Sequence, residues 1–140
     1  MSYDRNNVFA RILRGELPCH KVCEDEHTLA FMDIMPQTPG HTLVIPRREA
    51  RDLFELAPDA LAATILTTQR VAQAVRQAFA PPGVMIAQFN GAAAGQTVFH
   101  LHFHVIPRYD GESLVLHGAK MGDSAVLAGY AERIRACLDR

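Results

Sequence analysis

Three histidines alternate with bulky apolar residues in the run HLHFH, which occupies positions 100–104 of the 140-residue chain. Successive side chains of a β-strand point to opposite faces, so His100, His102 and His104 are expected on one face, roughly 6.5–7 Å apart at their Cα atoms. The apolar side chains between them suit a core. One such histidine is typical of an exposed strand position, but three within five residues indicate a functional site.

Two kinds of chemistry fit this run. Imidazoles along one strand can bind a metal ion. Imidazole also serves as nucleophile, hydrogen-bond donor and proton carrier near neutral pH, which suits chemistry on an anionic group. The stretch GAAAGQT at 91–97 favours the second reading, because small residues let backbone N–H groups approach an anion. Side chains that can hydrogen-bond to phosphoryl oxygens accompany it at Asn90, Gln96 and Thr97.

Hydrophobic periodicity and turn signals predict the elements that position these residues. Strands gathered around one long helix, without regular βαβ alternation, predict an α+β fold. We expect a mainly antiparallel sheet of about five strands packed on one long helix, with short N-terminal and C-terminal helices, in one domain over 1–140. The predicted helices are 7–14, 58–79 and 123–138, and the predicted strands are 19–23, 27–34, 41–46, 84–89 and 98–106. The inward face of the long helix is expected to carry Leu61, Ile65, Ala72, Val75 and Phe79.

Composition excludes several classes of function. The formal net charge is −1, so there is no overall positive field to hold nucleic acid by counterion release. No apolar run approaches the ~20 residues that span a bilayer. The odd count of three cysteines, together with an N-terminus unlike a secretory signal, leads us to expect a reducing, cytoplasmic location. Cys19 and Cys23 have no second cysteine pair with which to form a metal site.

The histidine run and its surroundings resemble the histidine triad (HIT) family. Residues 100–106 fit the pattern His-φ-His-φ-His-φ-φ, in which φ is apolar. The stretches LAFMDI at 29–34, GHTLVIP at 40–46 and GQTVF at 95–99 are similar to family motifs and occur in the same order. The resemblance extends from about Val8 to Pro107. It is closest to the nucleotide-binding hydrolase branch, including its bacterial members.

This resemblance implies roles for four histidines. His102 would be the nucleophile, attacking the α-phosphorus to form a nucleotidyl-histidine that water then hydrolyses. In the family a backbone carbonyl holds the other nitrogen of this ring. His104 would donate a hydrogen bond to the phosphate or the leaving group. His100, together with His41, would form the supporting polar network.

The resemblance also implies a nucleotide site. Asp33 would accept hydrogen bonds from the ribose hydroxyls, and Asn90, Gln96 and Thr97 would contact phosphoryl oxygens or the leaving group. The family often has Ser in place of Thr97, so the extra methyl group is expected to narrow the leaving-group pocket. An apolar base pocket with few contacts to the base edge predicts a preference for purines without strict base specificity. That pocket would be lined by Phe9, Ile12, Leu17 and Ile34.

One departure from the family concerns metal. Many bacterial members carry a structural zinc ion held by a Cys-x-x-Cys, a later histidine and the first histidine of the triad. The matching positions here are Asn7, Ala10 and Glu49, with His100 as the one remaining ligand. We therefore expect no structural zinc and no cofactor.

Four functions remain as hypotheses, in decreasing order of preference. The first is hydrolysis of nucleoside phosphoramidates or related purine nucleotide conjugates, and the second is hydrolysis of dinucleoside polyphosphates or nucleotidyl transfer. The third is nucleotide binding or protein interaction without catalysis, and the fourth is a metalloprotein built on the three histidines of the run. The resemblance further implies a homodimer in which the central sheets join.

Overall fold

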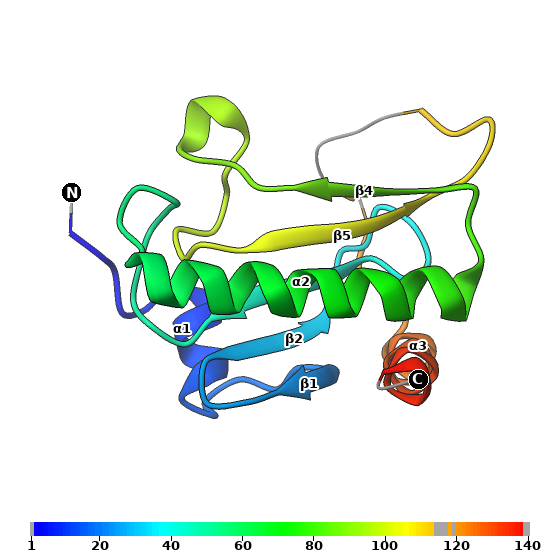
Figure 1. Ribbon diagram of the computed structural model, residues 1–140, viewed down its shortest axis with the longest axis horizontal. Helices are drawn as coiled ribbons and strands as arrows, with labels where there is room; N and C mark the ends of the chain where they lie inside the picture. Colours follow the sequence, from blue (N-terminus) through cyan, green and yellow to red (C-terminus); the bar gives the residue numbers. More distant parts are fainter. Residues whose placement is uncertain (1, 114–117, 119, 139–140) are drawn as a thin grey trace.

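A computed structural model describes residues 2–113, 118 and 120–138. Five strands form one antiparallel sheet in the order β1-β2-β3-β5-β4, with the long helix α2 lying across it (Figure 1). This confirms the predicted α+β architecture. The elements in chain order are α1 (Val8–Leu13), β1 (Lys21–Glu24), β2 (Thr28–Met32), β3 (Thr42–Pro46), α2 (Pro58–Phe79), β4 (Gly83–Ala87), the 3-10 turn η1 (Ala92–Ala94), β5 (Phe103–Arg108) and α3 (Ser124–Cys137).

Helix α2 begins and ends where the local chemistry dictates. Pro58 occupies the first turn, where its missing N–H costs no hydrogen bond, and Asp59 lies at the positive end of the helix dipole. The helix ends at Phe79, and the next residue, Ala80, adopts a left-handed conformation with φ of 46° and precedes two prolines. Within the described part of the chain, no helix is long and apolar enough to cross a membrane.

The face that α2 presents to the sheet differs in part from the prediction. Val75 is fully buried, but Ile65 is 44 % exposed. The buried face instead includes Thr64, Thr67 and Thr68. The hydroxyls of Thr64 and Thr68 donate to the carbonyls four residues earlier, at 2.7 and 2.8 Å. Because each buried hydroxyl has a partner, threonine is tolerated where hydrophobic periodicity alone predicts a larger apolar side chain.

The central strands are buried on both faces. Every position of β2 and β3 is buried, and successive side chains enter two different clusters. Towards α2, Val44 of β3 packs with Phe103 and Val105 of β5. On the opposite face, Phe31 and Leu43 pack against Phe9 of α1. Helix α3 completes the first cluster by covering the β1 end of the sheet (Figure 1).

Strand β5 begins at Phe103, not at Val98 as predicted. In the antiparallel ladder Thr42 pairs with Val105 and Val44 with Phe103, which brings Pro46 opposite the segment before Phe103. Proline has no N–H to donate, so the ladder with β3 cannot continue. Residues 98–102 therefore leave the sheet, and His100 and His102 lie before the strand.

Gly40 lies two residues before β3, where the 35–40 loop packs closely against the end of α2 and against β5. Its φ is +96°, and a Cβ here would lie 3.0 Å from ring carbons of Phe79 and from Cγ of Pro107. Both the backbone conformation and the close approach therefore favour glycine.

We expect Gly40→Ala to lower the free energy of unfolding by roughly 1–3 kcal/mol through strain and overpacking. Urea unfolding measures the effect. Gly15→Ala is the matched control, since Gly15 also has positive φ (+78°) but has open space around its Cα. Equal losses in the two variants would show that packing against Phe79 and Pro107 contributes nothing.

Candidate functional site

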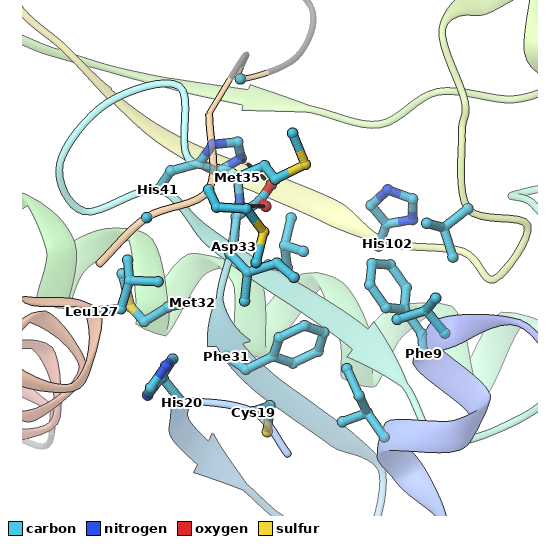
Figure 2. A pocket seen from close by; sticks show the side chains of 18 of the residues that line it. Phe9, Cys19, His20, Phe31, Met32, Asp33, Met35, His41, His102 and Leu127 are labelled. Carbon is cyan, nitrogen blue, oxygen red and sulfur yellow. Dashed lines mark hydrogen bonds and ion pairs between the residues drawn. The ribbon is translucent and has the colours of Figure 1, made fainter. Parts of the chain in front are cut away.

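A pocket of about 840 Å³ opens on the sheet face opposite α2. Helix α1 forms one wall, and the start of α3 forms another. Figure 2 shows His102 and Phe9 at one end, His20 and Leu127 at the other, and Asp33 between them. Its volume is in the range of small-molecule sites, and its lining is mostly apolar with a few polar groups.

His102 is held by a hydrogen bond to the backbone. Its Nδ1 lies 2.7 Å from the carbonyl oxygen of His100. A carbonyl can only accept, so we assign the ring proton to Nδ1. The lone pair then resides on Nε2, as nucleophilic attack requires. The Phe9 ring packs nearly perpendicular to this imidazole, with 4.9 Å between the ring centroids.

His41 and His104 form a second pair, both buried. The backbone N–H of Gln37 donates to His41 Nδ1 at 3.0 Å, so the proton of a neutral His41 is on Nε2. That Nε2 lies 3.0 Å from His104 Nδ1. Because His41 Nε2 carries a proton, His104 Nδ1 can only accept at this distance, and the proton of a neutral His104 is on its Nε2. His104 therefore has the tautomer of a donor, next to His102 at 4.9 Å between ring centroids.

Asp33 lies beside this pair. One carboxylate oxygen accepts the N–H of Met35 at 2.8 Å, and the other lies 3.4 Å from His41 Nε2. The carboxylate is partly exposed and lines the pocket. It can therefore accept hydrogen bonds from a bound ligand while the backbone contact orients it.

His100 belongs to a separate network and does not contact the pocket. Its Nε2 donates to the carbonyl of Pro46 at 2.8 Å, and its Nδ1 lies 2.5 Å from the hydroxyl of Tyr3. Burial lowers the pKa of His100, and the bond to Pro46 opposes that shift only in part. The sequence predicted one polar network that includes both His100 and His41, whereas the structure has two. His100 bonds to Tyr3 and Pro46, and His41 contacts His104 and Asp33.

The predicted nucleotide-binding residues fall into two groups. Pocket-lining residues are Phe9, Ile12, Leu17, Asp33, Ile34 and Thr97. Asn90 and Gln96 do not line the pocket. The Asn90 side-chain oxygen accepts the N–H of Leu53 at 2.9 Å, and the Gln96 amide donates to the carbonyls of Arg51 and Val98. Both side chains tie the 90–97 loop to the 51–53 segment, and their contact with a phosphate stays a prediction.

Several contributors were missing from the sequence-based prediction. Phe31 of β2 and Leu43 of β3 line the pocket and share one face of the sheet. The alternation of side chains along a strand is the sequence feature that could have placed them there. His20 and Ser124, 3.3 Å apart between Nε2 and Oγ, form a polar pair at the far end. Neither these two residues nor Tyr3 belong to a recognisable motif, because tertiary packing alone brings them to the site.

A metal ion bound by these histidines would have to break hydrogen bonds that their ring nitrogens already make. A site built on His100 would have to displace Tyr3 or Pro46 from its ring. Ligand atoms of Asp33, His41 and His104 do lie within 4.8 Å of one another. However, His41 Nδ1 already accepts from Gln37, so a metal at Nε2 would require the ring to lose its remaining proton. The arrangement suits proton-bearing donors better than ligands.

The buried, neutral His100 predicts a pH dependence of stability. Below about pH 6.5 the unfolded chain protonates this residue while the native state, with its lowered pKa, does not. The free energy of unfolding should therefore decrease as the pH falls from about 6.5 towards the native pKa. His100→Gln should make that decrease shallower in urea unfolding between pH 7.5 and 5. The exposed His27→Gln serves as control, and a slope in His100→Gln equal to that of the wild type would contradict the assignment.

Comparisons with known proteins identify the family to which this chain belongs. The HIT domain family matches residues 14–111. "Protein hit" of Bacillus subtilis is 43 % identical over 104 residues, which cover 74 % of this chain and 72 % of that protein. The Arabidopsis thaliana protein named adenylylsulfatase HINT3 is 35 % identical over 133 residues, or 95 % of this chain and 68 % of that protein.

Among solved structures, a Hit-like protein from Bartonella henselae, described as involved in cell-cycle regulation, has a TM-score of 0.93 and 45 % identity. The match covers 99 % of this chain and 100 % of that one. The family match includes all four histidines and most of the pocket. The chain therefore belongs to the HIT domain family of nucleotide-binding hydrolases.

Proposed function

We propose that this protein hydrolyses purine nucleotide conjugates at the α-phosphate, with nucleoside phosphoramidates as the preferred class, through a nucleotidyl-His102 intermediate. The observation that carries the proposal is the 2.7 Å contact between His102 Nδ1 and the His100 carbonyl. It assigns the nucleophilic lone pair to Nε2 of a side chain that lines the pocket. The name of the Arabidopsis relative, an adenylylsulfatase, supports adenylyl chemistry.

In the first step, the Nε2 lone pair of His102 forms a bond to the α-phosphorus. The phosphorus–nitrogen bond of the substrate breaks, and its electron pair leaves with the amine, which takes a proton from solvent. The modified imidazolium keeps its Nδ1 proton, and the His100 carbonyl that accepts it stabilises the positive charge.

In the second step, the oxygen of a water molecule attacks the same phosphorus. The bond to Nε2 breaks, its electron pair returns to His102, and the water releases a proton to solvent. The products are the nucleoside monophosphate and the unmodified enzyme. Because the group that leaves the nucleotidyl-imidazolium is a neutral imidazole, a good leaving group, this step needs no metal ion at His102.

In this scheme His104 acts on the phosphoryl oxygens, and His41 holds His104 in the tautomer that can donate. With His41 Nε2 donating to His104 Nδ1, His104 presents Nε2–H as a donor beside the nucleophile. A donor fixed before the reaction stabilises the negative charge that grows on the oxygens in the transition state. Asp33 would accept hydrogen bonds from the ribose hydroxyls, and the apolar lining around Phe9 and Phe31 would hold the base.

We expect wild-type protein to release AMP from adenosine 5′-phosphoramidate with chelator present. His102→Asn should lower kcat/KM by on the order of 10⁴-fold or more. Asparagine keeps an N–H for the His100 carbonyl but has no counterpart of Nε2, so the variant tests the nucleophile with little change in packing. His27→Asn, on the exposed turn between β1 and β2, is the matched control.

Other outcomes of this assay separate the alternatives. Cleavage of diadenosine tetraphosphate in preference to the phosphoramidate would assign the polyphosphate activity. Nucleotide binding without turnover of either substrate would indicate a binding protein and would contradict the proposal. Turnover lost on adding chelator would favour the metal mechanism.

We also propose that the protein works in the cytoplasm as a homodimer joined at β4. This strand lies at the edge of the sheet, where its backbone can pair with a second copy. Exposed apolar side chains lie on β4 and on α2, at Ile86 (45 % exposed) and Leu66 (60 % exposed).

A dimer of this kind should be lost in the double variant Leu66→Asp/Ile86→Lys, because both charges would have to be desolvated in the interface. Light scattering after size exclusion should give the mass of two chains for the wild type and of one for the variant. The variant Val126→Lys is the control, since Val126 is equally exposed (46 %) but lies on α3. A monomeric wild type would contradict the proposed dimer.

A further inference from the structure

The segment before α1 reaches the back of the histidine run through Tyr3. The Tyr3 hydroxyl lies 2.5 Å from Nδ1 of His100, although 97 residues separate them in the chain. The two rings also pack edge to face, with centroids 5.6 Å apart at an angle of 68°. Neither residue lines the pocket, so this contact supports the site from behind.

The direction of this hydrogen bond follows from the other side of the His100 ring. The Pro46 carbonyl can only accept, so Nε2 of His100 carries the proton and Nδ1 carries the lone pair. Tyr3 must therefore donate its hydroxyl proton to Nδ1. Burial, the largest influence, raises the pKa of Tyr3 and keeps that hydroxyl protonated, although a hydrogen bond from Asn7 works against the shift.

The backbone of His100 connects this contact to the proposed chemistry. Its carbonyl is the acceptor for His102 Nδ1–H. With Tyr3 and Pro46 holding opposite nitrogens, the His100 ring has one orientation. Residues 98–102 are outside the strand ladder, so β-sheet pairing does not hold that carbonyl. The N–H of the same peptide unit, that of Leu101, donates to the Ala50 carbonyl at 2.8 Å, and the His100 side chain is the second anchor of this peptide.

The family resemblance places the structural zinc site of many bacterial members in this same region, around His100. The residues present here do not fit that ion. Ala10 has no ligand atom, and the Asn7 side-chain oxygen accepts the N–H of Ala10 at 2.9 Å. Glu49 pairs with Arg5 at 3.1 Å. Both nitrogens of His100 are already hydrogen-bonded. A zinc site would need these contacts to break and would still lack a thiolate.

We infer that Tyr3 is a positioning residue: its hydrogen bond to His100, together with the backbone bond from Leu101 to Ala50, orients the carbonyl that holds His102 in the nucleophilic tautomer. The N-terminal segment thereby ties itself to the site by hydrogen bonds instead of metal ligands. The effect on catalysis rests on the function proposed above, whereas the effect on the His102 hydrogen bond does not.

The test compares Tyr3→Phe with Tyr130→Phe, which removes a hydroxyl from α3 on the other side of the sheet. We expect Tyr3→Phe to lower kcat for adenosine 5′-phosphoramidate roughly 2- to 10-fold, the cost of one hydrogen bond, with KM unchanged. The Nδ1–H proton of His102, assigned by NMR from its loss in His102→Asn, should exchange with solvent faster in Tyr3→Phe. Tyr130→Phe should match the wild type in both measurements.

A wild-type exchange rate for the His102 proton in Tyr3→Phe would overturn the inference, even if that variant melts at a lower temperature, because a purely structural role predicts that result. A wild-type kcat in Tyr3→Phe would overturn it as well. If the wild type turns over no substrate, the proposed function fails, and the exchange rate alone decides whether Tyr3 acts on His102.

Discussion

The hydrogen bond from His102 Nδ1 to the His100 carbonyl is the interaction on which the site depends. It decides which imidazole nitrogen can attack, and it can form because residues 98–102 leave the sheet ladder opposite Pro46. In a continued strand the carbonyl would face a neighbouring strand and not a side chain two residues on. The end of β5 is therefore as important to the chemistry as the histidine itself.

The two faces of the sheet have different roles: the face towards α2 forms the core, and the opposite face carries the candidate site. Towards α2 its side chains pack in an apolar core, with buried threonine hydroxyls satisfied inside the helix. The opposite face carries His104, next to Leu43 in the ladder, and is covered only in part by α1. That partial cover leaves the pocket, in which rigid neighbours hold each polar group through backbone contacts from Gln37, Met35 and His100.

Periodicity and motifs were sufficient to predict the architecture and the 58–79 helix, because both are encoded in local alternation. The predicted strand face with three histidines was wrong in part, because β5 begins at Phe103 and of the three only His104 lies on the strand. They were insufficient where long-range contacts decide. Nothing in the run itself shows that His100 turns to Tyr3 and Pro46 while His41 pairs with His104. The amide groups of Asn90 and Gln96 match a phosphate-binding pattern, yet here they bind backbone groups of the 51–53 segment and of their own loop.

The stereochemical course at phosphorus tests the central claim most directly. An adenosine phosphorothioamidate of known configuration is hydrolysed in ¹⁸O-water, and the configuration of the product is determined. Each in-line displacement inverts phosphorus, so two successive displacements through His102 predict net retention. Net inversion would show that water attacks the substrate directly and would contradict the covalent mechanism.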